Sequence, residues 1–312
     1  MSVFFGNWLY NRFSSSALYP YVQLARWDLP TGWCLLMWPC LWSTILAAHL
    51  LQKTQTLSFS VVFWYILLYI LGAIAMRGAG CTWNDLVDQE IDAQVGRTCT
   101  RPLPSGKCSR FQAYVFIMLQ LFVGFIVLIQ FNYFTICLGL AFLIIPILYP
   151  FAKRFTNCPQ VVLGLCFSGG SLIGWSSLQN SLSLSVFSLY IATICWVIGY
   201  DTIYAFQDKK DDELIGVGST AMLFAYRAKP WIFALYGIFV ACFMFSLYLV
   251  QVNFFGWIGL LIVSFMLVKQ VAVLDISLPE KCLVAFKNNN IIGMVMFISL
   301  VMSLLSSSFL RI

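Results

Sequence analysis

Nine long apolar stretches constrain this chain more than any other feature of its sequence. A helix needs about 20 mostly apolar residues to cross a lipid bilayer. Lipid tolerates only closed backbone hydrogen bonding, and strand-like alternation is rare here, so helices are predicted. We therefore expect an all-α membrane protein with nine transmembrane helices in a bundle. The expected helices lie at about 32–51, 59–78, 112–130, 134–151, 160–178, 183–203, 231–250, 254–274 and 291–310.

The composition agrees with a lipid environment. Hydrophobic residues make up 61% of the 312 residues and charged residues only 10%, whereas soluble domains carry about 25% charged residues. The net charge of +6 is not gathered in a basic run, so a nucleic-acid partner is not expected. The eleven cysteines are spread singly and His49 is the only histidine. Neither a disulfide framework nor a structural zinc site is therefore expected.

The basic residues test the predicted number of helices. In a nine-helix topology, all 18 Lys and Arg residues except Lys53 and Arg311 fall on one side of the membrane. The positive-inside rule places that side, and the N-terminus, in the cytoplasm. The first 28 residues contain only two basic residues, Arg12 and Arg26, and no signal-peptide pattern. We predict a protein of the bacterial inner (plasma) membrane, with the mitochondrial inner membrane as the alternative.

The loops suggest an internal repeat. Short, nearly uncharged loops alternate with longer, charged ones, and the charged loops follow the second and sixth predicted helices. We expect a cytoplasmic N-terminal segment (1–28) and a single transmembrane domain (29–312). Within that domain, two four-helix repeats are predicted at about 29–155 and 156–280, followed by a ninth helix at about 290–310.

Nine of the twelve acidic residues gather in two short segments, one in each long charged loop. Like charges at a membrane boundary repel one another unless cations neutralise them. Both segments are predicted to lie on the cytoplasmic side, at equivalent points of the repeat. The acids are Asp85, Asp88, Glu90 and Asp92 in the first segment, and Asp201, Asp208, Asp211, Asp212 and Glu213 in the second.

Helical periodicity gathers most of these acids on two faces, each about 100° wide. Glu90 and Glu213 fall outside these faces. Two carboxylate-lined faces suit Mg²⁺ ions, which take one or two carboxylates each and leave positions for phosphate and water. The alternative is that the acids are solvated loop charges balanced by nearby Lys and Arg. The first face holds Asn84, Asp85, Asp88 and Asp92, and the second holds Asp201, Tyr204, Asp208, Asp211 and Asp212.

The two acidic segments and their flanks resemble the UbiA family of intramembrane prenyltransferases. Residues 84–92 read NDLVDQEID, which fits the family motif NDxxDxxxD, and RTCTRPLPSG follows at 97–106. The second motif reads YDTIYAFQDKKDD at 200–212. RWDLPTG at 26–32 and YPFAKR at 149–154 agree as well. The second motif is similar to the branch of the family that acts on 4-hydroxybenzoate in ubiquinone synthesis.

The resemblance implies a reaction. Two Mg²⁺ ions would bridge the carboxylates and a polyprenyl diphosphate, whose prenyl group passes to the ring carbon ortho to the hydroxyl of 4-hydroxybenzoate. The lipid bilayer is the other expected partner, and no obligate protein partner is evident. The expected metal ligands are Asp85, Asp88, Asp92, Asp208, Asp211 and Asp212. The expected catalytic residues are Asp85, Asp88, Asp201 and Asp208. The expected substrate-binding residues are Asn84, Arg77, Arg154, Lys209, Tyr149 and Tyr204.

Some of these roles have more than one interpretation. Asp201 either binds metal or contacts the hydroxyl of the acceptor, and Arg77 or Arg154 binds its carboxylate in two-point fashion. Many relatives carry Lys where Leu29 and Gly218 stand, which predicts altered affinity or prenyl-chain preference. A relative acting on another aromatic acceptor is the alternative enzyme. A transporter is disfavoured because it would need acids through the membrane, whereas here all lie on one predicted side.

Overall fold

The computed structural model describes residues 16–54, 57–94, 96, 98–207, 209 and 218–309. Within these residues all regular structure is helical, and nine segments are long and apolar enough to cross a membrane. The predicted fold class is confirmed: this is an all-α, multi-pass membrane protein. The helices that make up the spans are α3 (Thr31–Thr54), α4 (Phe59–Val87), α6 (Arg110–Leu128), α7 (Tyr133–Phe142) with α8 (Ile144–Phe155), α9 (Pro159–Gln179), α10 (Leu184–Ala205), α13 (Ala228–Val250), α14 (Phe254–Val273) and α15 (Pro279–Phe309).

Short helices fill three of the connections. They are α2 (Tyr19–Leu24) before the first span, α5 (Gln89–Asp92) after α4, and α12 (Thr220–Phe224), which continues through a 3₁₀ turn (Ala225–Arg227) into α13. The expected helix at 291–310 begins earlier, at Pro279, where the fixed φ of proline suits the first helical turn. Two equivalent four-helix repeats remain a prediction.

The fourth span is broken in the middle. α7 ends at Phe142 and α8 begins at Ile144, where a single helix at 134–151 was expected. Pro146 lies in the first turn of α8, and its nitrogen cannot donate to the carbonyl of Phe142. A proline in the first turn of a helix costs no backbone hydrogen bond, so ending one helix before Pro146 and starting another accommodates it. Pro39 and Pro150, in contrast, lie inside α3 and α8.

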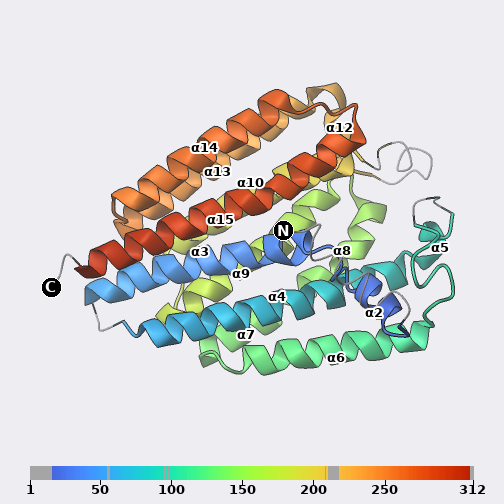
Figure 1. Ribbon diagram of the computed structural model, residues 1–312, viewed down its shortest axis with the longest axis horizontal. Helices are drawn as coiled ribbons and strands as arrows, with labels where there is room; N and C mark the ends of the chain where they lie inside the picture. The colour runs from blue at the N-terminus through green and yellow to red at the C-terminus, as the bar shows by residue number, and fades with distance from the viewer. Residues whose placement is uncertain are drawn as a thin grey trace.

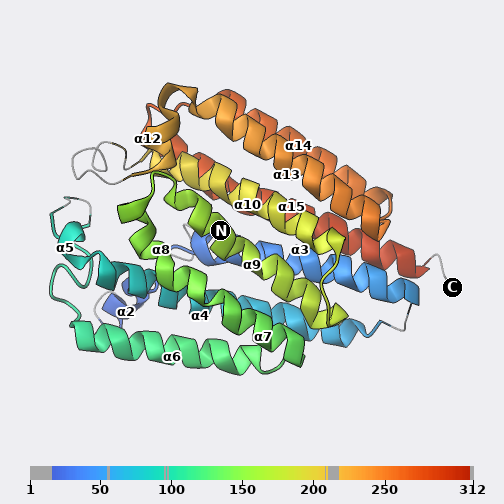
Figure 2. The ribbon, with the colours of Figure 1, turned by 180° about the vertical axis from the view of Figure 1, so that it is seen from behind.

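The spans are arranged around a central group of helices (Figures 1 and 2). α3 contacts α4, α9 and α15, and α10 contacts α9 and α13, so α3, α9 and α10 are the most enclosed helices. α6 lies at one edge and α14 at the opposite edge (Figure 1). Phe111, Met118 and Phe122 of α6 and Leu261 and Phe265 of α14 are exposed. These outward apolar faces suit contact with lipid tails.

Aromatic residues and polar contacts hold the centre of the bundle together. The Trp42 ring centroid is 4.9 Å from that of Trp196 and 5.5 Å from that of Phe243. The Trp42 indole N–H donates to the carbonyl of Gly293 at 3.0 Å, and Trp196 donates to Asn289 Oδ1 at 2.9 Å. Lipid supplies no hydrophobic force between helices, so such packing and hydrogen bonds fix α15 against α3 and α10.

The ends of several helices meet at one end of the bundle. α5, the C-terminal end of α10 and α12 lie together at the right of Figure 1, far from the last helical residues of α15. The first acidic motif and Asp201 with Tyr204 therefore occupy the same end of the molecule, as the topology predicted. α2 lies at this end as well, where the rings of Tyr21 and Trp27 contact Phe116 of α6.

Candidate active site

The first acidic motif forms one continuous buried face. Although α4 ends at Val87, the Asp88 N–H donates to the carbonyl of Asn84 at 2.9 Å, and the Asp92 N–H donates to that of Asp88 at 2.8 Å. Helical hydrogen bonding thus continues into α5, and the side chains keep their helical spacing. Asp85, Asp88 and Asp92 are buried, whereas Glu90 is exposed. The predicted placement of Glu90 off the carboxylate face is confirmed.

Arginines surround this carboxylate face. Arg26 Nη2 lies 2.9 Å from both carboxylate oxygens of Asp85. Arg101 Nη1 lies 2.7 Å from Asp92 and 3.3 Å from Asp85. Arg154 Nη2 is 3.9 Å from Asp88. Carboxylates held out of water require such positive partners, and the arginines supply them here.

Arg26 was not among the residues expected at the site. Burial opposes its charge, but the carboxylate of Asp85 together with other nearby groups, among them Asp28, offsets this effect, and the pKa of Arg26 is raised. Burial also raises the pKa of Asp28, against the attraction of Arg26. The signal available in the sequence was the segment 26–32, in which an arginine and an aspartate precede the first span.

A second group of expected residues lines a cavity between the helices. Arg77 of α4, Tyr149 of α8, and Asp201 and Tyr204 of α10 all border it. The Arg77 Nε is enclosed, has no hydrogen-bond partner among the described residues, and its guanidinium carbon is 5.3 Å from the centre of the Phe167 ring. A cation with an unused donor in an enclosed cavity can bind an anionic group there.

Charge inside this cavity is divided between Arg77 and Asp201. The two side chains carry opposite charges and attract one another electrostatically. Gly32 lies directly against Arg77, since a Cβ at that position would stand 2.7 Å from the Arg77 Nε. The side chain of Arg77 therefore depends on a glycine in α3 for its position.

Gly218 borders the same cavity, at a position where the family resemblance led us to expect Lys. A Cβ there would stand 2.8 Å from the carbonyl oxygen of Thr156 and 2.9 Å from the Cα of Asn157. Both are backbone atoms, which cannot move aside cheaply. The local backbone of this chain thus has no room for a side chain at residue 218. Leu29, the other such position, is exposed.

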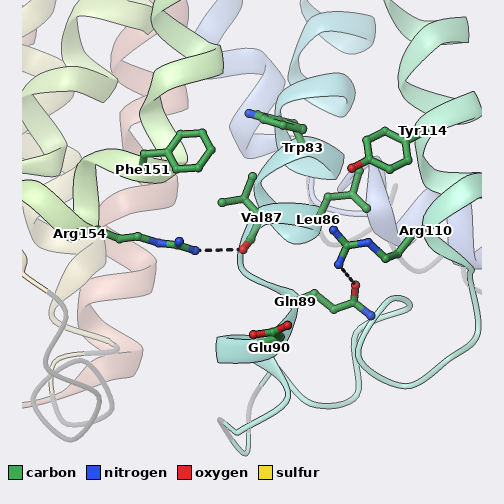
Figure 3. Close-up of a pocket in the computed structure, with 9 residues that line it drawn as sticks. All are labelled: Trp83, Leu86, Val87, Gln89, Glu90, Arg110, Tyr114, Phe151 and Arg154. Atoms are coloured by element: carbon green, nitrogen blue, oxygen red, sulfur yellow. Dashed lines mark hydrogen bonds between the residues drawn. The ribbon is translucent and has the colours of Figure 1, made fainter.

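Arg154 lies apart from Arg77. It borders a different pocket, between α4, α6 and α8, and donates to the carbonyl of Val87 at 3.1 Å (Figure 3). Either Arg77 or Arg154 was expected to bind the acceptor carboxylate. Of the two, Arg77 alone borders the cavity that Asp201 lines. The structure therefore brings Arg77, Asp201, Tyr149 and Tyr204 together and places Arg154 beside Asp88 instead.

The second acidic motif is described only at residues 200–207 and 209. Asp208, Asp211 and Asp212 lie outside the described residues, so the predicted pair of facing carboxylate rows remains a prediction. Lys209 Nζ lies 6.0 Å from the centre of the Phe206 ring. Among the residues that the structure describes, no three His, Cys, Asp or Glu side chains form a metal-binding group.

The donor set of the first motif nevertheless fits magnesium. Asp85, Asp88 and Asp92 offer carboxylate oxygens, and Asn84 at the last turn of α4 adds an amide. These are hard oxygen donors of the kind that Mg²⁺ prefers, and one or two carboxylates per ion are usual. The position of Arg26 and Arg101 on Asp85 shows that this face attracts positive charge.

Residues 36–301 match the model of the UbiA prenyltransferase family. The chain belongs to this family. Curated UbiA-family relatives from Drosophila melanogaster and Homo sapiens are both named "4-hydroxybenzoate polyprenyltransferase, mitochondrial". The Drosophila protein is 41% identical over 300 residues, which cover 94% of this chain and 73% of the relative. The human protein is 41% identical over 293 residues, covering 91% and 75% respectively.

Solved structures share the UbiA fold. A UbiA homologue from Aeropyrum pernix superposes with a TM-score of 0.71 at 21% identity, covering 86% of this chain and 97% of that one. A homologue from Archaeoglobus fulgidus, described as bound to GPP and Mg²⁺, gives a TM-score of 0.66 at 17% identity, covering 91% and 99%. At these identities the likeness supports the fold.

Proposed function

We propose that this chain transfers a polyprenyl group from polyprenyl diphosphate to the ring carbon ortho to the hydroxyl of 4-hydroxybenzoate, in ubiquinone biosynthesis. The observation that carries the proposal is the pairing of two features at one end of the bundle. One is the buried carboxylate face of Asp85, Asp88 and Asp92, and the other is the cavity that Arg77 and Asp201 line. The names of relatives about 40% identical over most of the chain support the same substrate pair.

The metal-binding part of the proposal concerns both motifs. Asp85, Asp88 and Asp92 are assigned to magnesium together with Asp208, Asp211 and Asp212, with Asn84 and Lys209 beside the diphosphate. When bound, Mg²⁺ acts as a Lewis acid that neutralises the leaving diphosphate. Two ions are proposed, because a bridging diphosphate carries more negative charge than one ion offsets. The relative from Archaeoglobus fulgidus described with GPP and Mg²⁺ supports the metal.

Arg101 is the cation best placed to accompany this chemistry. Its guanidinium already contacts Asp85 and Asp92, and its remaining N–H donors can turn to phosphate oxygens. Arg26 holds the other side of Asp85 and so keeps the carboxylate oriented.

The acceptor is proposed to lie in the cavity. Arg77 binds its carboxylate, since an enclosed guanidinium offers two parallel donors to a carboxylate. Asp201 orients the acceptor hydroxyl or takes its proton. The allylic C–O bond breaks, the ring carbon ortho to the hydroxyl forms the new C–C bond, and that carbon then loses its proton. Leu163, Phe167 and Phe286 line the cavity with apolar surface and keep water from the cationic prenyl group.

Two tyrosine rings line the cavity in which the prenyl cation is proposed to form. Tyr204 packs against Phe286 with ring centroids 4.7 Å apart, and Tyr149 borders the same cavity. The faces of such rings attract cations. Tyr149 and Tyr204 are therefore proposed to stabilise the prenyl cation rather than to anchor the protein at the membrane surface.

A mitochondrial membrane is proposed as the site of this activity. The relatives carry "mitochondrial" in their names, and none of these names supports the bacterial plasma membrane that the charge pattern suggested. The acidic motifs would then face the side of that membrane on which most Lys and Arg residues lie.

The experiment uses washed membranes that contain the full chain, one labelled polyprenyl diphosphate and a panel of aromatic acids. We expect product with 4-hydroxybenzoate, and none when its carboxylate or its hydroxyl is removed. Product with a naphthoate or a homogentisate in place of 4-hydroxybenzoate would replace the proposed acceptor.

A further inference from the structure

A pocket outside the proposed active site lies where α4, α6 and α8 approach one another (Figure 3). Arg110 and Tyr114 of α6 line one side, and Phe151 and Arg154 of α8 line the other. Trp83 lies between them on α4. Arg77, Asp201 and the rest of the acceptor cavity do not border this pocket, and its one link to the first acidic motif is the contact of Arg154 with Asp88.

The two arginines enter the pocket from opposite sides with most of their donors available. Arg110 Nη1 donates to Gln89 Oε1 at 3.0 Å, and Arg154 Nη2 donates to the carbonyl of Val87 at 3.1 Å. Both acceptors are neutral, so they position the guanidinium groups without cancelling their charge. Each guanidinium carries five N–H donors. Among the described residues, Arg110 forms no ion pair with an acid, and Arg154 is 3.9 Å from Asp88.

Glu90 is the one acid that lines this pocket within the described residues. It lies on the side of the pocket away from Trp83 and is exposed (Figure 3). Water and salt screen an exposed carboxylate strongly. Asp88 offsets part of the charge of Arg154, so the surplus of positive charge in the pocket comes mainly from Arg110.

The surroundings place this charge at the boundary between lipid and water. Phe111 follows Arg110 and is 76% exposed, and Phe155 follows Arg154 and is 85% exposed. Trp83 and Tyr114 are residue types that collect at the level of lipid headgroups. The Trp83 N–H donates to the carbonyl of Ile147 at 3.1 Å, which fixes its ring between α4 and α8. An occupant of the pocket thus meets guanidinium groups at one end and apolar side chains at the other.

We infer that this pocket binds the phosphodiester headgroup of an anionic membrane phospholipid, with its acyl chains lying along the exposed apolar faces of α6 and α8. Phosphate oxygens match the fork of donors on a guanidinium, and basic pockets between transmembrane helices bind anionic headgroups. A soluble phosphate would satisfy the arginines but leave the apolar lining of Trp83, Leu86 and Phe151 without a partner. The lipid uses both parts of the pocket.

The test uses the full chain purified in an uncharged detergent and titrated with short-chain phosphatidylglycerol, with thermal stability as the readout. Phosphatidylcholine of the same chain length and inorganic phosphate serve as comparison ligands. The wild type is expected to gain stability with phosphatidylglycerol and not with the other two. Arg110→Gln should raise the concentration needed for half of this gain at least about tenfold, since a charge-assisted hydrogen bond is lost.

Lys281→Gln is the matched control, because it removes the same charge from an exposed residue at the start of α15 that pairs with Asp275. It should bind phosphatidylglycerol as the wild type does. Arg110→Lys keeps the positive charge but loses the planar set of N–H donors, so it should bind phosphatidylglycerol with an intermediate affinity. This variant can replace Arg110→Gln in the test if Arg110→Gln fails to fold.

Four outcomes of the titrations would overturn the inference, and a competition experiment adds a fifth. They are equal binding by Arg110→Gln and wild type, an equal loss in Lys281→Gln, an equal gain with phosphatidylcholine, and an equal gain with inorganic phosphate. Displacement of phosphatidylglycerol by 4-hydroxybenzoate would also overturn it and would assign the pocket to aromatic acids.

Discussion

Asp85 is held by two arginines and is also assigned to magnesium. Its side chain is almost fully enclosed, and Arg26 and Arg101 both contact it. A carboxylate in this position stabilises the fold through buried ion pairs and offers oxygen ligands to a metal. Its replacement therefore has two separate consequences, which different measurements distinguish.

Asp85→Asn is expected to lower prenyl transfer at least about 100-fold, as loss of a charge-stabilising group in an active site does. It should also lower the free energy of unfolding by about 3 kcal/mol, because Arg26 loses its buried carboxylate partner while Arg101 keeps Asp92. Activity per folded molecule and thermal unfolding measure these effects separately. Glu280→Gln, an exposed acid at the start of α15, is the control and should change neither. Wild-type rates for Asp85→Asn at limiting Mg²⁺ would contradict the metal assignment.

Gly32→Ala tests the position of Arg77. The added Cβ would stand 2.7 Å from the Arg77 Nε, so the guanidinium must move. A shift of about 1 Å in a positioning group can cost up to about 100-fold in rate. We expect a higher KM for 4-hydroxybenzoate and an unchanged KM for the polyprenyl diphosphate, both from steady-state kinetics.

Gly80→Ala is the matched control, since a Cβ at Gly80 meets nothing within 4 Å. It should leave both KM values unchanged. Equal effects of the two alanines would show that Arg77 does not bind the acceptor carboxylate.

At the scale of elements, α15 is held in place by the close approach of its backbone to two tryptophans and by hydrogen bonds, in addition to the apolar surface that it buries. Its Gly293 lies under the ring of Trp38, and the carbonyl of the same residue accepts the Trp42 N–H. Trp196 donates to Asn289 one turn earlier. Small residues let helices approach closely in membranes, and polar contacts then fix their register. α15 therefore depends on a glycine at one particular turn.

Gly293→Ala is expected to destabilise the bundle by about 1–3 kcal/mol, as overpacking of a tight interior does. Its Cβ would stand 2.4 Å from a ring carbon of Trp38. Gly237→Ala on α13, where a Cβ meets nothing within 4 Å, should not destabilise it. Thermal unfolding in detergent checks both, and a lower melting temperature for Gly237→Ala alone would refute the packing argument.

At the scale of the whole molecule, different interactions stabilise the helical bundle and the proposed metal site. The enclosed helices α3, α9 and α10 pack through Trp42, Trp175 and Trp196, all fully buried. The carboxylates of the first motif are neutralised by arginines of the chain itself. The fold should therefore persist without a divalent ion, while prenyl transfer should not.

Chelation tests this separation. Excess EDTA is expected to abolish prenyl transfer, and added Mg²⁺ to restore it, because the leaving diphosphate needs neutralising charge. Helical content by circular dichroism should stay constant throughout. Full activity in EDTA would remove magnesium from the proposal, and a parallel loss of helix would show that the ion also supports the fold.

The spans, their order and the end of the bundle that bears the acids were all predictable from the sequence. Hydrophobic length and helical spacing are local properties, so the shared face of Asp85, Asp88 and Asp92 and the position of Glu90 off that face followed from their positions along one helix. Only the tertiary structure decided that Arg26 pairs with Asp85, that Arg77 rather than Arg154 shares a cavity with Asp201, and that residue 218 has no room for a side chain. Those contacts join residues far apart in the chain, and packing alone selects which side chains meet.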